Sequence, residues 1–270
     1  MKRSIRFVAA CTALAMGGSS PAQSPAESPI GNWNLERSPA QCVISRQYGP
    51  SEAPVTLGFK APPLGDAVQM VIVRPERRTR VEQNAATITI GTQNVATTAL
   101  AYPLGDRRRR AAYLVNLTGE ESADLRLAGE IKVKVGGPMN RRFELRPMSG
   151  AWNQLDDCLE RLRQTWNIGE GKLASPAQPI IPLGQLFHPE DYPIKVALDG
   201  KSGTTGVILL IDESGAVKDC TLASTSGVAV LDSRTCSIIL SGGKFAPATF
   251  GDGKPAKSAY RRRIGWRLVE

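Results

Sequence analysis

Two cysteines, Cys220 and Cys236, lie sixteen residues apart in a segment whose pattern predicts a strand, a turn and a helix. Thiols at such positions could form a disulfide, bind a metal or carry out redox chemistry. The sequence has no Cys-x-x-Cys and no His-x-x-x-His spacing, which argues against a metal site. Cys42 and Cys158 are the other cysteines after the first 22 residues, so this part of the sequence has an even number of cysteines, four. An even set in an oxidising compartment favours disulfides, and four cysteines allow three pairings.

Arrangements typical of catalysis are poorly represented. His188 is the only histidine, and nothing in the sequence pairs it with a nucleophile. The acidic neighbours Asp156-Asp157 and Glu120-Glu121 point apart on a helix or a strand, so they do not form a paired-carboxylate site. We therefore expect no enzymatic activity and no cofactor.

The first residues predict export. Three basic residues precede an apolar run from Phe7 to Met16, which is typical of a secretory signal peptide, residues 1–22, cleaved after Ala22. The alternative is a lipoprotein box at residues 8–11, although few apolar residues stand before Cys11. No later run approaches the roughly 20 apolar residues that cross a bilayer as a helix. We expect a soluble exported protein, with a retained signal acting as an anchor as the alternative.

Charge narrows the set of partners. The formal net charge is +9, and an exported basic chain suits anionic lipid or cell-wall polymer better than nucleic acid. The densest basic run, Asp106 to Arg110, follows Pro103-Leu104-Gly105 and is expected on a turn between strands. The alternative to a binding role for this run is a solvated loop.

Residues 30–168 predict a β-rich domain. Short runs at residues 68–73, 86–90 and 131–135 are rich in β-branched side chains, and the last two alternate apolar with polar residues. This pattern with frequent turns predicts an antiparallel sandwich or barrel.

A helix is expected to close this domain. Its apolar stripe has spacings of three and four and consists of Trp152, Leu155, Leu159, Leu162 and Trp166. Cys158 lies beside the stripe and should face the domain, so Cys42 near the domain's start is its natural partner. The two tryptophans are expected in the core.

A proline- and glycine-rich linker, residues 169–187, is expected to precede a second domain, residues 188–270. Residues 207–211 and 217–223 predict two strands joined by a hairpin turn at residues 212–215. Helical spacing then resumes at Val228, Leu231, Thr235 and Ile239. If this helix packs on the hairpin, Cys220 and Cys236 meet, and a bond closing that loop stabilises by about 3 kcal/mol in the chain-entropy account.

The last predicted strand has two different faces. The apolar face, interrupted by Arg262, carries Tyr260, Ile264, Trp266 and Leu268. The other face, expected to meet water, carries Arg261, Arg263, Gly265 and Arg267. If this strand is an edge, its free N–H and C=O groups can pair with an incoming chain. The alternative is that the arginines deter unwanted pairing.

A series of motifs after the linker resembles the TonB C-terminal domain family, over residues 189–270. The motifs occur in the family's order and include EDYP at residues 190–193, DESGAVKDC at 212–220, STSG at 224–227, FAPA at 245–248, DGKP at 252–255 and the closing IGWRL. Cys220 and Cys236 resemble a disulfide-bearing alphaproteobacterial branch of that family.

The resemblance implies an α+β fold in which a three-stranded antiparallel sheet packs on a helix, located in the periplasm. In energy transducers of the family, this domain grips an extended segment of an outer-membrane receptor, which adds as a strand near the last strand, and transmits force. The resemblance thus implies partner-binding roles for Asp191, Tyr192, Pro193, Arg261, Arg263, Ile264, Gly265 and Arg267.

The sequence shows neither the inner-membrane helix nor the long proline-rich reach of a transducer. We therefore expect a non-enzymatic periplasmic protein that binds an extended segment of an outer-membrane receptor or other envelope partner in TonB-dependent transport. The alternative is a structural or scaffolding envelope protein that contacts the cell wall or anionic lipid. Its TonB-like unit would then serve for packing or for a homodimer.

Overall fold

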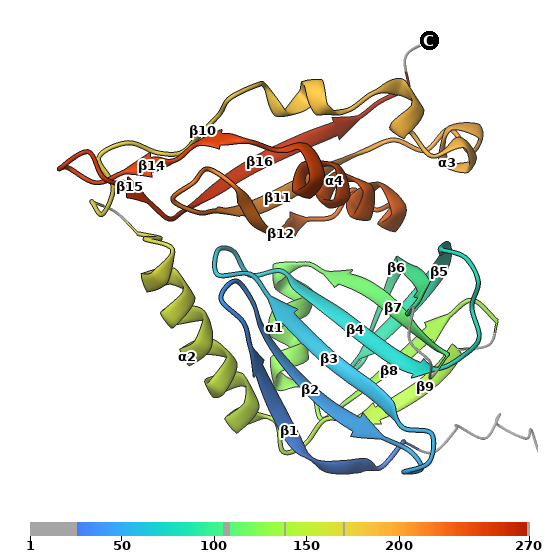
Figure 1. The fold of residues 1–270 in the computed structure, drawn as a ribbon. Helices are drawn as coiled ribbons and strands as arrows, with labels where there is room; N and C mark the ends of the chain where they lie inside the picture. The colour runs from blue at the N-terminus through green and yellow to red at the C-terminus, as the bar shows by residue number, and fades with distance from the viewer. Residues whose placement is uncertain (1–25, 105–108, 138, 170, 269–270) are drawn as a thin grey trace, which may run out of the picture.

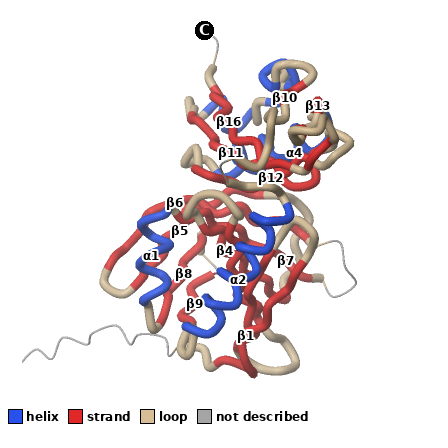
Figure 2. Tube along the Cα trace, turned by 90° about the vertical axis from the view of Figure 1, so that its left-hand side faces the viewer, coloured by secondary structure: helices blue, strands red, loops and turns tan. Residues whose placement is uncertain are grey.

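The computed structural model describes residues 26–104, 109–137, 139–169 and 171–268 (Figure 1). The expected signal peptide, residues 1–22, lies outside the described residues. A strand-rich N-terminal region, residues 26–168, and a C-terminal region, residues 171–268, stack on each other (Figures 1 and 2). Within the described ranges, no helix combines the length and the apolar character that crossing a bilayer requires.

The N-terminal region is built on one curled sheet of nine antiparallel strands in the order β1-β2-β3-β4-β7-β6-β5-β8-β9. The three runs named from the sequence lie in β4, β5 and β8, so this prediction of strands is confirmed. The strands are β1 (Pro29–Arg37), β2 (Cys42–Tyr48), β3 (Val55–Ala61), β4 (Val68–Pro75), β5 (Glu82–Ile90), β6 (Gln93–Pro103), β7 (Arg110–Leu117), β8 (Glu130–Val135) and β9 (Met139–Glu144).

Alternation of side chains decides which residues fill the inside of this sheet. In β8, Ile131, Val133 and Val135 are buried while the residues between them are exposed. Tyr48 is fully buried, and its hydroxyl donates a hydrogen bond to the Glu144 carbonyl at 2.8 Å. Burial raises the pKa of Tyr48 to about 12, so this hydroxyl keeps its proton.

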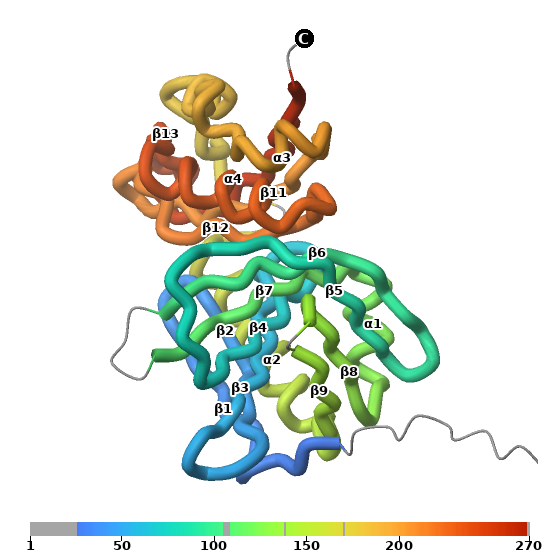
Figure 3. Tube along the Cα trace, turned by 90° about the vertical axis from the view of Figure 1, so that its right-hand side faces the viewer, coloured from blue at the N-terminus to red at the C-terminus, as the bar shows by residue number. Residues whose placement is uncertain are grey.

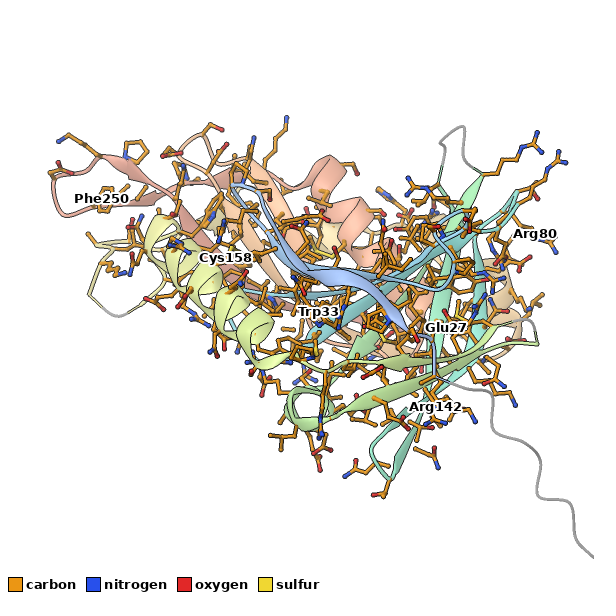
Figure 4. The ribbon with its side chains drawn as sticks, turned by 90° about the horizontal axis from the view of Figure 1, so that it is seen from below. Glu27, Trp33, Arg80, Arg142, Cys158 and Phe250 are labelled. Carbon is orange, nitrogen blue, oxygen red and sulfur yellow. A yellow bond between two sulfur atoms is a disulfide. The ribbon has the colours of Figure 1, made fainter. Side chains whose placement is uncertain are left out.

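The two ends of the sheet approach each other. Glu27, just before β1, forms a parallel bridge with Phe143 of β9, and its N–H donates to the Arg142 carbonyl at 2.7 Å (Figure 4). The indole N–H of Trp33 in β1 donates to the Leu145 carbonyl at 3.1 Å. These contacts curl the sheet into a barrel-like form.

Helix α2 (Ser149–Thr165) packs beside β1 and β2, as Figure 1 shows. Cys158 of α2 is bonded to Cys42 of β2 with a Cα–Cα distance of 6.2 Å, so the expected tie between the helix and the first strands is confirmed. The whole predicted stripe is buried, including both tryptophans: Trp152, Leu155, Leu159, Leu162 and Trp166.

The structure adds a helix, α1 (Gly119–Leu127), that the strand pattern does not predict. The Thr118 side chain accepts a hydrogen bond from the N–H of Glu121, and the Glu121 carboxylate accepts one from the N–H of Thr118 at 2.7 Å. This capping box satisfies the free donors at the start of the helix. The acidic pair Glu120-Glu121 therefore lies in the first turn of α1, where negative charge is favourable.

The C-terminal region contains a three-stranded antiparallel sheet in the order β12-β11-β16, with helix α4 (Ala229–Gly242) packed on one face. Cys220 of β12 is bonded to Cys236 of α4, with a Cα–Cα distance of 5.5 Å, as expected. The predicted stripe of α4 is buried. The elements are η2 (Pro189–Asp191), α3 (Ile194–Leu198), β11 (Gly203–Ile211), β12 (Val217–Ser224), β13 (Phe245–Ala246), β14 (Ala248–Thr249), β15 (Pro255–Ala256) and β16 (Ser258–Trp266).

A tight turn joins β11 to β12 at the predicted place. The carboxylate of Asp212 accepts hydrogen bonds from the N–H groups of Ser214 and Ala216 at 2.9 and 3.0 Å. Gly215 has φ +82°, and a Cβ at this position would lie 1.9 Å from the Phe245 carbonyl oxygen. Both the backbone conformation and the close approach therefore require glycine here.

The segment predicted as a linker connects the two regions and also packs on the C-terminal one. Its β10 (Gln178–Pro179) pairs with β13, and it contains a short 3₁₀ helix, η1 (Leu183–Leu186). Ala177 and Leu183 are each 2% exposed and share a core with β11. Leu210 of β11 joins the core of the N-terminal region instead. Because the cores meet in this way, the division into two domains stays a prediction.

Candidate functional site

Strand β16 forms one edge of the C-terminal sheet. It runs antiparallel to β11, from Ser258 opposite Ile211 to Trp266 opposite Gly203. In the described part of the chain, β11 is its only strand partner. Successive residues of a strand direct their N–H and C=O groups to opposite sides. Alternate residues of β16 therefore present backbone donors and acceptors away from β11.

The apolar face of β16 anchors the strand. Ile264 and Trp266 are 7% and 5% exposed, which confirms that Trp266 is a core residue. The Trp266 ring meets Phe187 edge-on at a centroid distance of 5.3 Å, and its indole N–H donates to the hydroxyl of buried Thr235 on α4 at 2.8 Å. These contacts fix the strand's position without involving its outer edge.

The opposite face of the sheet is covered in its middle by the N-terminal region. Ile208 and Leu210 of β11 are each 1% exposed, because the N-terminal region covers them. On β16, Ala259 packs against the same N-terminal core. Arg261 lies next to Gly65 of the β3–β4 loop yet remains exposed. Arg261, Arg263, Gly265 and Arg267, the residues expected to meet water, are all exposed, whereas the middle of the sheet on this side is covered.

Strand β12, the other edge of this sheet, faces the N-terminal region (Figure 3). Buried Asp219 of β12 accepts hydrogen bonds from the Gln41 amide at 2.6 Å and from the Lys60 ammonium at 3.3 Å, both across the contact. Residues 220–224 of β12 line two hollows together with residues of β3, β4, β6 and β7. The N-terminal region thus lies against β12 on the side of Asp219.

The N-terminal region also caps helix α4. The residue before the helix, Val228, makes no side-chain capping bond. Instead, the Thr98 hydroxyl of β6 accepts a hydrogen bond from the Ala229 N–H at 3.1 Å, and the Gln83 side-chain oxygen of β5 accepts one from the Val230 N–H at 2.9 Å. Two free donors of the first turn are therefore satisfied by side chains from distant strands. The sequence carries no local signal of this arrangement.

Arginines line the exposed part of β16 and its continuation. Arg261, Arg262 and Arg263 are exposed within the strand, and exposed Arg267 follows it. Among the described residues, none of these four guanidinium groups has an ion-pair partner. The strand therefore combines free backbone groups with unneutralised positive charge.

A small hollow of about 160 Å³ lies along β16. Its lining contains the consecutive residues 262–266 together with Gly184 and Phe187 of the linker segment. Since successive side chains point to opposite faces, a hollow that touches all of these residues lies at the strand's edge, and β11 occupies the other edge. Sequence reasoning does not identify Gly184 or Phe187, because the linker's irregular pattern gives no sign of contact with the last strand.

The Tyr-Pro motif, Asp191 to Pro193, lies beside the buried end of β16. The Tyr192 ring meets Trp266 edge-on at a centroid distance of 5.5 Å, and the Tyr192 hydroxyl donates to the Lys201 carbonyl. The Asp191 carboxylate accepts a hydrogen bond from the His188 N–H at 3.0 Å. These contacts hold the motif against the last strand, so its position is explained by internal packing. Its role in binding a partner stays a prediction.

The basic run lies on the connection from β6 to β7, as predicted. Residues 105–108 lie outside the described residues, whereas Arg109, with φ +49°, and Arg110 at the start of β7 are described. In the parts of the chain that the structure describes, no cluster of three or more His, Cys, Asp or Glu side chains could hold a metal ion.

Comparison with known proteins agrees with the motifs from EDYP to IGWRL. Residues 188–268 match the family model described as Gram-negative bacterial TonB protein C-terminal. None of the curated proteins matches the chain. The matched residues run from the Tyr-Pro motif through β11, β12 and α4 to the end of β16, and a domain of this kind marks a TonB-like envelope protein. The carboxyl-terminal region of this chain is thus a member of the Gram-negative bacterial TonB protein C-terminal family.

Proposed function

We propose that this chain is a non-enzymatic periplasmic protein that binds an extended segment of an outer-membrane receptor or another envelope protein in TonB-dependent transport. The segment adds as a strand along β16. The observation that carries the proposal is that β16 pairs with a single strand, β11, among the described residues, while β12 and the second face of the sheet lie against the N-terminal region.

Free backbone groups supply the affinity in this mode of binding. Each hydrogen bond between strands contributes on the order of 1 kcal/mol net, and alternate side chains supply specificity. A guest pairing with the length of β16 would form several such bonds. Because Ile264 and Trp266 are already buried against the body of the domain, the strand is fixed before the guest arrives. Binding to a fixed strand avoids part of the ordering cost.

Proline substitution tests this mode. Arg262 and Arg263 are neighbours, so one N–H points towards β11 and the other points outward. Arg262→Pro and Arg263→Pro each remove one of these donors, while Arg262→Ala and Arg263→Ala remove the same charges and keep the donors. The variants are compared in a pull-down with immobilised peptides from receptor N-termini.

We expect one proline variant to lose stability and the other to stay folded and release the peptide. The alanine variant at that second position should retain more peptide than the proline variant does. Equal peptide retention by the folded proline variant and its alanine control would contradict strand addition at β16. Retention on peptidoglycan that depends on Arg109 and Arg110 would instead support a scaffolding role.

A further inference from the structure

We propose that the segment accepted by β16 alternates acidic with apolar residues. This inference rests on the proposed strand addition and names the chemistry of the guest. Acidic side chains of the guest would lie beside Arg261 and Arg263 on one face. An apolar side chain on the other face would enter the hollow beside Ile264 and Phe187.

The arginines of β16 and its continuation differ from many other arginines of the molecule. Elsewhere many arginines are neutralised: Arg78 pairs with Glu82, and Arg126 donates two hydrogen bonds of 2.8 Å to Asp156. The arginines from Arg261 to Arg267 have no such partners among the described residues. Opposite charges on directly neighbouring strands attract, and like charges repel. An acidic guest therefore fits this edge, and a basic one is excluded.

The hollow beside β16 offers space for a side chain of the guest. Gly184 and Phe187 line the hollow together with residues 262–266 of β16, and its volume is about 160 Å³. The lining includes the apolar side chains of Ile264 and Trp266. A side chain that fills such a space removes apolar surface from water, which favours binding in proportion to the area covered. Phe187 packs on Trp266, which lies on the same face of β16 as Ile264, so guest residues on that face lie nearest the apolar lining, and this sets the alternation.

The same arginines would deter pairing with most other strands. Edge strands commonly carry charges that prevent aggregation, and this effect does not conflict with recognition of an acidic segment. Repulsion of basic strands and attraction of acidic ones are two parts of one specificity.

The test uses three synthetic peptides of equal length that alternate Glu-Val, Gln-Val or Glu-Ala. Their affinities for the full chain are measured by fluorescence anisotropy at low and high salt. We expect Glu-Val to bind on the order of tenfold more tightly than Gln-Val, since several exposed ion pairs each contribute a modest factor. Because salt screens exposed charges, that advantage should shrink at high salt.

Two variants assign the effect to the edge. The double variant Arg261→Gln/Arg263→Gln should remove most of the preference for Glu-Val, whereas Arg161→Gln, which removes an exposed arginine of α2, should keep it. A Cβ at Gly184 would have no atom within 4 Å, so Gly184→Leu can fill the hollow without a clash at the backbone. That variant should remove the preference of the protein for Glu-Val over Glu-Ala.

The outcomes separate this inference from the proposed function. Equal affinities for Glu-Val and Gln-Val, both lost in the folded proline variant, would overturn the acidic preference and leave strand addition standing. If both proline variants keep the preference for Glu-Val, charge acts without strand pairing, and both proposals are overturned.

Discussion

The two edge strands of the C-terminal sheet have nearly the same length and opposite surroundings. In β12, the residues from Asp219 to Leu222 are buried in succession, which requires cover on both faces. In β16, Arg261 to Arg263 are exposed in succession. A strand's place at the edge of a sheet therefore does not decide its exposure. The N-terminal region decides it, because that region lies against β12 and leaves β16 open (Figures 1 and 3).

This contrast gives the N-terminal region a structural role. Through Asp219 it holds one edge strand, and through Thr98 and Gln83 it caps α4. These contacts hold the N-terminal region against β12 and the start of α4 and leave β16 exposed from Arg261 onward.

The largest expected effect concerns the covalent attachment of β12, which β16 lacks. Replacing Cys220 and Cys236 with serine should lower the free energy of unfolding by about 3 kcal/mol, because the bond constrains the unfolded chain. Urea denaturation measures this change, and Ser237→Ala on the same helix serves as the control. A loss below about 1 kcal/mol would contradict this stabilisation by the bond between β12 and α4. Peptide binding to β16 by the folded variant should persist.

The next effect compares one substitution on each edge. Asp219→Ala should lower the free energy of unfolding by about 2 kcal/mol, because Lys60 and Gln41 lose a buried acceptor. Arg263→Ala should change it by no more than about 0.5 kcal/mol, since Arg263 is exposed and has no partner among the described residues. Asp219→Asn keeps an acceptor oxygen and should lie between these values. If Asp219→Ala and Arg263→Ala lowered the free energy of unfolding equally, the contrast between a buried β12 and an exposed β16 would have no basis.

A smaller effect is expected at the cap of α4. Thr98→Ala removes the acceptor for the Ala229 N–H and should cost about 1 kcal/mol of unfolding free energy. Thr97→Ala, at the neighbouring position of β6, is the matched control. A thermal unfolding curve of each variant gives the comparison. If the two alanine variants unfold alike, the N-terminal region does not stabilise α4 through this cap.

The smallest effect is expected in the turn that joins β12 to β11. Burial alone would raise the pKa of Asp212, but hydrogen bonds from Ser214 and Ala216 outweigh it and lower the pKa below its usual value. A lowered folded pKa stabilises the protein above the unfolded value and loses this contribution as pH falls. Unfolding free energies at about pH 5 and about pH 3 should differ more in the wild type than in Asp212→Asn. An equal pH dependence in both would contradict the assigned role.

Much of the C-terminal region could be predicted because its signals are local. The hairpin turn at residues 212–215, the stripe of α4 and the Cys220–Cys236 pair each depend on residues close in sequence. The Cys42–Cys158 bond spans 116 residues, yet the stripe of α2 shows which side of that helix faces inward.

The contacts between the regions could not be predicted in the same way. Gln41, Lys60 and Thr98 come from separate strands, and nothing in their spacing indicates a shared surface. One signal was nevertheless present. Residues 207–211 are continuously apolar, which is typical of a strand buried on both faces, and this agrees with the cover that the N-terminal region gives to β11. The capping box from Thr118 to Glu121 was likewise a local signal for α1.

Hydrogen–deuterium exchange of the backbone amides, with and without the alternating Glu-Val peptide, tests the open edge of β16 most directly. Outward-pointing amides of alternate β16 residues should exchange quickly in the free protein and become protected when the peptide is bound, while the amides of β12 stay unchanged. Protection that appears on β12, or no change along β16 at peptide concentrations that saturate binding, would contradict the account.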